Sequence, residues 1–278
     1  MPNLNIFLLP HFDDEVGCLG LIRWSLLSQS DTLIVHLTRG DRKFGAFLNA
    51  SEGAEEVRKS ESKRLLKFLI SGALTNPYWE DLGSDLNVGD SDLVFHLREV
   101  LMALWNHVQG HLLTSQEVDV RIFTPDFEGG HPDHDSSALI ALHLREMLCS
   151  LGHAASCWAF PMYRRNPLSP LPALFKLTPV GGERTIIATP LDLRTRIAGL
   201  LCPYFFRSQI RTILSLYFGI LRTYLFARCQ VAWSLNEIPF QALNEGPGFL
   251  YEARGRFKPA EWRREAVENI GDERGFIT

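Results

Sequence analysis

The stretch LNIFLLPHFDDE, residues 4–15, joins an apolar run to a histidine and three consecutive acids. The apolar part, Leu4–Leu9, is typical of a buried β-strand. Carboxylates packed this closely at the end of a strand repel one another, and a bound metal relieves that repulsion better than water does. The stretch therefore predicts a strand whose carboxyl end binds a cation.

A second cluster of histidine and aspartate has the same setting. The sequence GGHPDH, residues 129–134, follows another strand-like run, Val118–Thr124. Two clusters of this kind at two strand ends can converge on one ion. The alternative for each cluster alone is a solvated helix start, where acids suit the helix dipole and proline suits the first turn.

Strand and helix patterns alternate over the first 150 residues. Strands are expected at 4–9, 32–37 and 118–124, and helices at about 15–28, 51–70, 91–109 and 133–148, the third capped by Asp90 and Ser91. This alternation predicts an α/β fold with a mainly parallel sheet and helices on both faces. In such folds ligands bind at the carboxyl ends of the strands, where both clusters lie.

The pattern is looser after residue 150. Strands are expected at 156–160 and 185–188, a helical region at about Leu193–Ala227, and a turn with a short strand within Gly246–Phe257. No linker or internal repeat separates the two parts. We therefore expect a single domain over residues 1–278, in which 1–150 form the catalytic core and 151–278 shape the substrate pocket.

Composition limits the class of protein. The net charge of −4 gives no basic footprint for nucleic acid. The five cysteines are scattered without a CxxC pair, which indicates buried thiols in a reducing compartment. The N-terminus lacks the features of a signal peptide, and no uncharged apolar run is long enough to span a membrane, so a cytoplasmic location is expected.

One apolar segment keeps two interpretations. Ile213–Ala227 is interrupted by Arg222 and flanked by Arg211 and Arg228. It fits a packed helix, and it also fits a surface that contacts a lipid-carrying substrate or a membrane face. The oligomeric state cannot be read from the sequence.

The two clusters contain the ligand types of a catalytic zinc site, which usually takes three protein ligands and leaves one position open. His11, Asp14 and His134 supply such a set, although iron or cobalt also suits these nitrogen and oxygen donors. Asp13 is then left beside the metal, where a carboxylate can take a proton from water.

The remaining residues of the second cluster fit a second role. His131 lies two positions from Asp133, and a carboxylate partner fixes the tautomer of an imidazole and raises its pKa. Such a histidine can stabilise an oxyanion or protonate a leaving amine. Together the six side chains describe metal-assisted hydrolysis of an acyl bond.

These residues also carry a resemblance to a known family. PHFDDE resembles the AHPDDE signature of the LmbE-like, or PIG-L, family of zinc-dependent N-acetylglucosaminyl deacetylases, and GGHPDH resembles its HPDH signature. Further similarities are the turn Thr38–Asp41, the R-x-x-E of Arg58 and Glu61, and Ser208-Gln209 after Tyr204.

The resemblance implies a Rossmann-like sheet and a role for each matched residue. It implies Zn²⁺ ligands His11, Asp14 and His134, the base Asp13, the oxyanion-stabilising or acid histidine His131, its partner Asp133, and a substrate-facing Arg58. The usual reaction of the family removes acetyl from an N-acetylglucosamine-type sugar or conjugate. Two positions depart from the pattern: Phe12 replaces a proline, and Gly129 stands where some members carry a substrate-facing tyrosine.

Several other interpretations compete with this one. Arg58 and Glu61 could form a structural ion pair, and His36 fits a core histidine better than a ligand. The chain could be a catalytically silent sugar- or metal-binding protein of the same fold, although every catalytic position is filled. A dinucleotide enzyme is disfavoured, because no G-x-G-x-x-G follows the first strand and the acids there would repel pyrophosphate.

Overall fold

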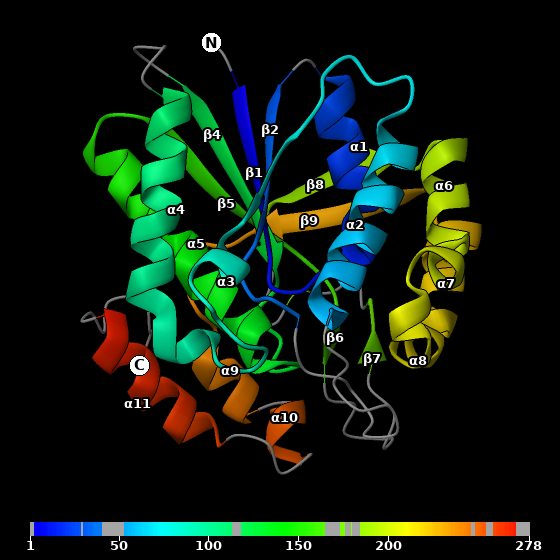
Figure 1. The fold of residues 1–278 in the computed structure, drawn as a ribbon. Coiled ribbons are helices and arrows are strands. Elements are labelled where there is room, and N and C mark those ends of the chain that lie inside the picture. The colour runs from blue at the N-terminus through cyan, green and yellow to red at the C-terminus, as the bar shows by residue number, and fades with distance from the viewer. Residues whose placement is uncertain are drawn as a thin grey trace.

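A seven-stranded sheet in the order β3-β2-β1-β4-β5-β9-β8 forms the centre of the molecule (Figure 1). The computed structural model describes residues 3–28, 30–40, 53–112, 118–164, 173–175, 179, 184–245, 248–253 and 258–270. The strands of this sheet are β1 (Asn3–Leu9), β2 (Asp31–His36), β3 (Tyr78–Asp81), β4 (Asp119–Pro125), β5 (Ala154–Phe160), β8 (Ile186–Pro190) and β9 (Cys229–Ser234). A small second sheet pairs β6 (Tyr163–Arg164) with β7 (Ala173–Leu174).

The first five strands are parallel, as the strand and helix alternation predicts. β1 pairs with β2 on one side and with β4 on the other, so the carboxyl ends of β1 and β4 are neighbours. Only β9 and β8, from the later part of the chain, run antiparallel to their neighbours in this sheet. The prediction of a Rossmann-like, mainly parallel sheet with helices on both faces is confirmed.

Helices cover both faces of the sheet (Figure 1). The α-helices are α1 (Leu19–Leu27), α2 (Ala54–Ile70), α3 (Leu82–Asp85), α4 (Leu97–Leu112), α5 (Pro132–Ser150), α6 (Leu193–Leu200), α7 (Cys202–Phe205), α8 (Ile210–Leu221), α9 (Phe240–Glu245), α10 (Leu250–Ala253) and α11 (Pro259–Ile270). Short 3₁₀-helical segments are η1 (Asp14–Gly17), η2 (Leu93–His96) and η3 (Arg207–Gln209), and η4 (Arg222–Phe226) is a π-helical segment.

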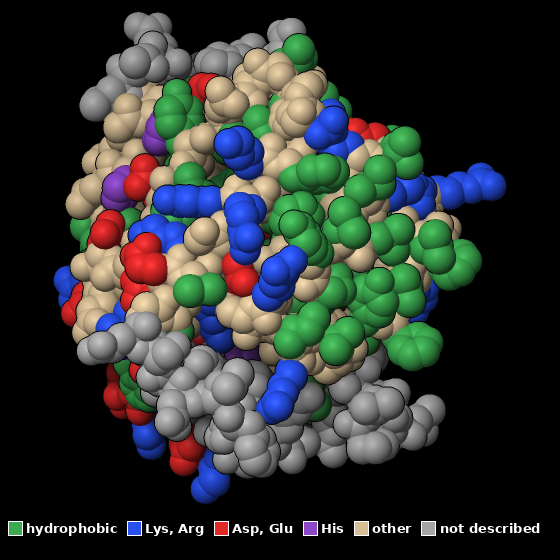
Figure 2. All heavy atoms as spheres, turned by 45° about the vertical axis from the view of Figure 1, so that its right-hand side comes forward, with side chains coloured by type: hydrophobic (Ala, Val, Ile, Leu, Met, Phe, Trp, Pro, Cys, Tyr) green, Lys and Arg blue, Asp and Glu red, His purple; other side chains and the backbone are tan. Residues whose placement is uncertain are grey.

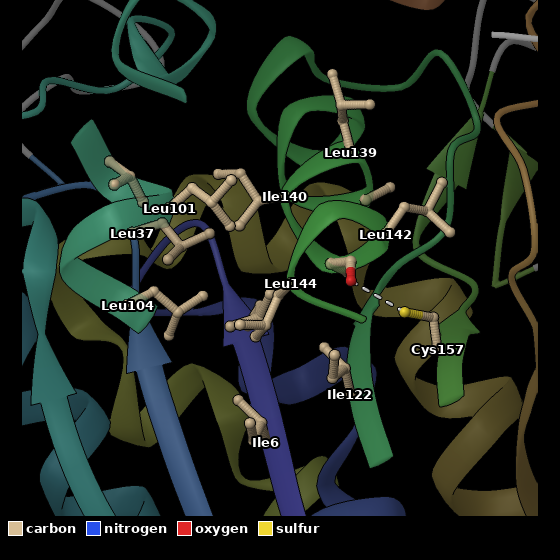
Figure 3. Close-up of a cluster of buried hydrophobic side chains, with 14 of the residues drawn as sticks. Ile6, Leu37, Leu101, Leu104, Ile122, Leu139, Ile140, Leu142, Leu144 and Cys157 are labelled. Atoms are coloured by element: carbon tan, nitrogen blue, oxygen red, sulfur yellow. Dashed lines mark hydrogen bonds between the residues drawn. The ribbon is translucent and has the colours of Figure 1, made fainter. Parts of the chain in front are cut away.

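Successive side chains of β1 point to opposite faces of the sheet and pack in two separate hydrophobic cores. Ile6 and Leu8 pack with α4 and α5, whereas Phe7 and Leu9 pack with α1 and α2 on the other face. Figure 3 shows the first core from close up, where the Cys157 thiol donates a hydrogen bond of 3.1 Å to the Ala141 carbonyl. Both faces of the strand are buried, which explains why its sequence is a continuous apolar run.

The later part of the chain departs from the predicted pattern. The helical region at 193–227 is divided into α6, α7, η3, α8 and η4, and Pro203 at the start of α7 interrupts the backbone hydrogen bonds of a longer helix. The prediction of a short strand within 246–257 is wrong for the central part of this segment, which forms the helix α10. Residues 41–52, which include the end of the turn Thr38–Asp41 and the start of the helix expected at about 51–70, lie outside the described residues.

Two smaller expectations also change. Asp90 and Ser91 do not cap the helix before α4, because Asp92 occupies the position preceding η2. Buried thiols are found at Cys18, Cys157 and Cys202, but Cys149 is exposed. In the described part of the chain, no helix combines the length and apolar character needed to cross a bilayer.

Candidate metal and catalytic site

The loops after β1 and before α5 meet at the carboxyl edge of the sheet. His11 Nδ1 lies 3.1 Å from Asp14 Oδ2, and His134 Nε2 lies 3.2 Å from Asp14 Oδ1. One donor atom from each of these three residues falls within 4.8 Å of the others. The structure therefore brings together the three side chains that the sequence proposes as ligands, although 120 residues separate Asp14 from His134.

The donor atoms of this cluster fit a cation. His134 Nε2 is buried and makes no hydrogen bond with another described residue, although it faces Asp14 Oδ1. Burial alone would raise the pKa of Asp14, but His134 and His11 hold that pKa well below its usual range. Burial lowers the pKa of His11, yet Asp14 and Asp133 raise it well above its usual range. The cluster thus favours positive charge at its centre, which a divalent metal ion supplies.

A second, overlapping set of donors consists of His11, His131 and Asp133. The lone pairs of this set are already engaged. Asp133 Oδ2 accepts a hydrogen bond of 2.6 Å from the Ser91 amide, and His131 Nδ1 accepts one of 3.2 Å from the Asp133 amide. In the first set Asp14 Oδ2 accepts the His11 amide at 2.8 Å, but His134 Nε2 makes no hydrogen bond with another described residue, and we therefore favour this set for a metal ion.

Asp133 lies closer to His11 than to His131. Its Oδ2 atom is 3.0 Å from His11 Nε2 and 3.7 Å from His131 Nδ1. The carboxylate predicted to orient His131 therefore contacts His11 more directly. Because His131 Nδ1 accepts the Asp133 amide, a neutral His131 carries its proton on Nε2, where it can donate to a substrate.

Asp13 lies beside the cluster, and its carboxylate makes no hydrogen bond with another described residue. It is half-buried and precedes η1, but its carboxylate makes no capping hydrogen bond. Burial and the neighbouring Asp14 raise the pKa of Asp13 to about 7. A carboxylate with this pKa and an uncommitted oxygen can exchange a proton near neutral pH.

Glu15, the third acid, has a structural role. It is fully buried, and His36 Nε2 lies 2.9 Å from its Oε1 atom, which also accepts the Ser62 hydroxyl. These contacts join η1 to β2 and α2, and they agree with His36 as a core residue. Phe12 packs on the His36 ring at a centroid distance of 4.5 Å. Phenylalanine in place of proline therefore adds an aromatic contact under the metal-binding loop.

Arg58 reaches the same edge from α2. The guanidinium is buried and pairs with Asp90 at 3.3 Å, and the Thr38 hydroxyl donates to the other Asp90 oxygen at 2.8 Å. A Cβ atom on Gly40 would lie 3.1 Å from Arg58 Nη1, which places the guanidinium against the turn after β2. Asp90 was expected to cap a helix, so its contact with Arg58 was missed.

Glu61 bonds to Ser208 on η3. Its Oε1 accepts the Ser208 amide at 3.0 Å and its Oε2 accepts the Ser208 hydroxyl at 2.5 Å. The interpretation of Arg58 and Glu61 as one ion pair is therefore replaced by separate contacts with Asp90 and Ser208. The bonds explain why two motifs so far apart in the chain, R-x-x-E and Ser208-Gln209, occur together.

We expect Glu61→Gln to lower the free energy of unfolding by about 1–3 kcal/mol, because a charge-assisted pair of hydrogen bonds is lost and the new amide faces two donors. Urea denaturation measures the change. Glu56→Gln, on an exposed position of the same helix, is the matched control and should leave stability within about 0.5 kcal/mol of the original. Equal stability of both variants would contradict the role of Glu61.

An aromatic residue that the sequence did not reveal completes the site. The Tyr163 ring of β6 lies 5.2 Å from the His134 ring. Gly129 has a positive φ of 64°, and a Cβ on Gly130 would lie 1.9 Å from the Tyr163 carbonyl oxygen. Gly130 is thus required for β6 to approach the histidine loop, whereas Gly129 is required by its left-handed backbone and its contact with Phe249. Tyr163 supplies an aromatic side chain where Gly129 cannot. Gly130 was the available signal for this close approach.

Comparisons with known proteins agree with the geometry. A family model described as PIG-L, GlcNAc-PI de-N-acetylase, matches residues 6–144. A search of curated proteins gave no match.

Three solved structures share the fold. They are an N,N′-diacetylchitobiose deacetylase from Pyrococcus horikoshii (17% identity, TM-score 0.54, 88% of this chain and 86% of that chain), the zinc inhibited form of a teicoplanin deacetylase (12%, 0.55, 84% and 97%) and an A40926 pseudoaglycone deacetylase (14%, 0.51, 84% and 96%). At these identities the likeness shows the fold.

Proposed function

The chain belongs to the PIG-L family of GlcNAc-PI de-N-acetylases, and from this membership we propose that it is a metal-dependent amide hydrolase. Its proposed reaction removes an acetyl or other acyl group from an N-acylated amino sugar or its conjugate. One observation carries the proposal: His11, Asp14 and His134 converge with compatible donor atoms, and Asp13 lies beside them without a hydrogen-bond partner among the described residues.

The proposed metal site uses His11, Asp14 and His134. The preferred ion is Zn²⁺, with iron or cobalt as alternatives for the same donors. When bound, such an ion supplies Lewis acidity, which polarises an acyl oxygen and lowers the pKa of water. Burial of Asp14 and His134 keeps this edge of the sheet poor in water, which strengthens electrostatic interactions there.

The side chains around the metal site divide the proton transfers. Asp13 takes the proton of the water molecule that attacks the acyl carbon. His131 donates a hydrogen bond from Nε2 to the developing oxyanion, and Asp13 passes the proton that it took from water to the nitrogen that leaves as the C–N bond breaks. Asp133 positions both histidines: its carboxylate contacts His11 Nε2, and its backbone amide donates a hydrogen bond to His131 Nδ1. Arg58 faces the substrate from α2 in this proposal.

We further infer that residues 1–278 work as one domain. The supporting observation is that β8 and β9, from the later part, extend the same sheet as β1 to β5. Residues 1–150 would carry the chemistry, and residues 151–278 would shape the substrate side through elements such as β6.

The direct test is acetate release from N-acetylated amino sugars by metal-free protein to which one metal at a time is returned. The substrates should include free N-acetylglucosamine, diacetylchitobiose and hydrophobic conjugates, since the fold relatives are described as deacetylases of N,N′-diacetylchitobiose and of the A40926 pseudoaglycone. Zinc should be titrated from below one equivalent, because one relative is described in a zinc inhibited form.

We expect amine and acetate to form in equal amounts with at least one divalent metal, and activity to disappear on adding a chelator. Binding of metal without turnover of any N-acylated sugar would instead support a catalytically silent protein of this fold. That outcome would overturn the proposed reaction while leaving the metal site intact.

A further inference from the structure

A group of exposed apolar side chains covers α6, α7, α8 and η4. We call it the α6–η4 patch, and its most exposed members are Leu193, Tyr204, Leu214, Phe218, Leu225 and Phe226. In the described part of the chain, 17 large apolar side chains are exposed, and nine of them lie between residues 193 and 226. Figure 2 shows these side chains gathered on one face of the molecule. Such a concentration marks an interaction surface.

The patch is built from projecting side chains. On α8, Ile213 and Ile220 face inward, whereas Leu214 and Phe218 lie one turn apart on the outer face. Phe218 is 87% exposed and Phe226 is 75% exposed, so both rings extend into solvent. Rings that project in this way suit insertion into a soft apolar medium better than the filling of a rigid groove.

The charged side chains within the segment that forms the patch are all basic. Residues 193–228 contain six arginines and no aspartate or glutamate, in a chain whose net charge is −4. Arg196 donates to the Tyr224 and Ala227 carbonyls, and Arg222 donates to the Leu174 and Phe175 carbonyls. Carbonyl oxygens position these guanidiniums without neutralising them. Figure 2 shows basic side chains beside the apolar ones.

We propose that the α6–η4 patch docks the protein on the surface of an anionic lipid bilayer. Aromatic and leucine side chains enter the acyl boundary, and the arginines extend to lipid phosphates, which match guanidinium geometry. A second copy of the chain fits the patch poorly, because a two-fold interface would place the six arginines of residues 193–228 in one copy against the same six in the other, and this segment contributes no acid to offset them.

The docking surface is connected to the candidate site by the β6–β7 pair. Arg222 bonds to the Phe175 carbonyl at 2.6 Å, and the Phe175 amide donates to the Met162 carbonyl at 2.8 Å. Tyr163, the next residue, lies beside His134. A bilayer on the patch would therefore contact the elements next to the site without covering the metal ligands.

The test is flotation of the full-length chain with vesicles of phosphatidylcholine alone and of phosphatidylcholine mixed with phosphatidylglycerol. We expect binding to the mixed vesicles, weakening as salt is raised. The double variant Phe218→Ser/Phe226→Ser should reduce partitioning at least about tenfold. Arg207→Gln/Arg228→Gln should remove the preference for anionic lipid while the apolar surface is kept.

Leu74→Ser/Leu151→Ser is the matched control, because these side chains are 63% and 59% exposed and lie outside the patch. It should bind vesicles as the original chain does. Equal losses in the control and in the phenylalanine variant would overturn the proposal, as would binding that ignores lipid charge. Sedimentation tests the competing occupant, a second copy of the chain. If the original chain is a dimer that does not bind vesicles, and the phenylalanine variant is a monomer, the patch is a dimer interface.

Discussion

Asp13→Asn should lower kcat/KM for acetate release by about 10²–10⁴-fold, the range typical of losing a general base. Asparagine keeps the size of the side chain but cannot accept a proton from water. Because the Asp13 carboxylate makes no hydrogen bond with a described residue, the substitution breaks no structural contact there. The loss should therefore appear in the reaction rate while metal affinity and thermal stability change little.

The pH profile provides a second measurement of the same role. Burial and Asp14 raise the pKa of Asp13 to about 7, and a bound cation lowers it again by favouring the charged form. The base works only when ionised, so kcat/KM of the original chain should fall about tenfold per pH unit on the acid side of that pKa, at or below pH about 7. Asp13→Asn should lose this acid limb.

Asp31→Asn is the matched control, since Asp31 is exposed at the start of β2, at the edge of the sheet away from the site. It should keep both the rate and the acid limb. Equal turnover in Asp13→Asn and in the original chain would reject Asp13 as the base. An unchanged acid limb in a slow variant would assign that limb to another group.

The central arrangement was readable from the sequence because it follows from two local signals and one rule. The apolar runs of β1 and β4 identify buried strands, and each is followed directly by histidine and aspartate. Parallel strands place their carboxyl ends on one edge, and β1 and β4 are neighbours in the sheet. The convergence of His11 and His134 needs no further information.

The contacts that were missed depend on segments whose sequence pattern does not predict where their side chains and backbone amides point. Asp90 has the composition of a helix start, but the positive φ of Ser91 turns the chain so that the Ser91 amide reaches Asp133. Tyr163 lies on a two-residue strand, too short to have a period. Likewise, the choice of Asp133 between His11 and His131 is decided by differences below 1 Å, which no spacing rule can resolve.

His134→Ala should reduce zinc affinity at least about 100-fold. Removing a group that only supports a ligand typically costs 10–100-fold, so loss of a direct ligand should reach at least the upper end of that range. Competition with a fluorescent zinc chelator measures the affinity. A thermal scan gives an independent measurement, because ligand at 100 times its Kd stabilises a folded protein by about 2.7 kcal/mol, and the variant should lose most of that shift.

The two overlapping donor sets make this experiment discriminating. If His11, Asp14 and His134 bind the metal, His131→Ala should retain zinc and lose turnover, because His131 would then act only on the substrate. If the set of His11, His131 and Asp133 binds it, the two variants should exchange behaviour. His96 is a half-buried histidine of η2 that pairs with Glu99, so His96→Ala should change neither zinc affinity nor turnover. Tight zinc binding by His134→Ala would remove His134 from the metal site, and the assignment of Asp13 as its neighbouring base would lose its geometric support.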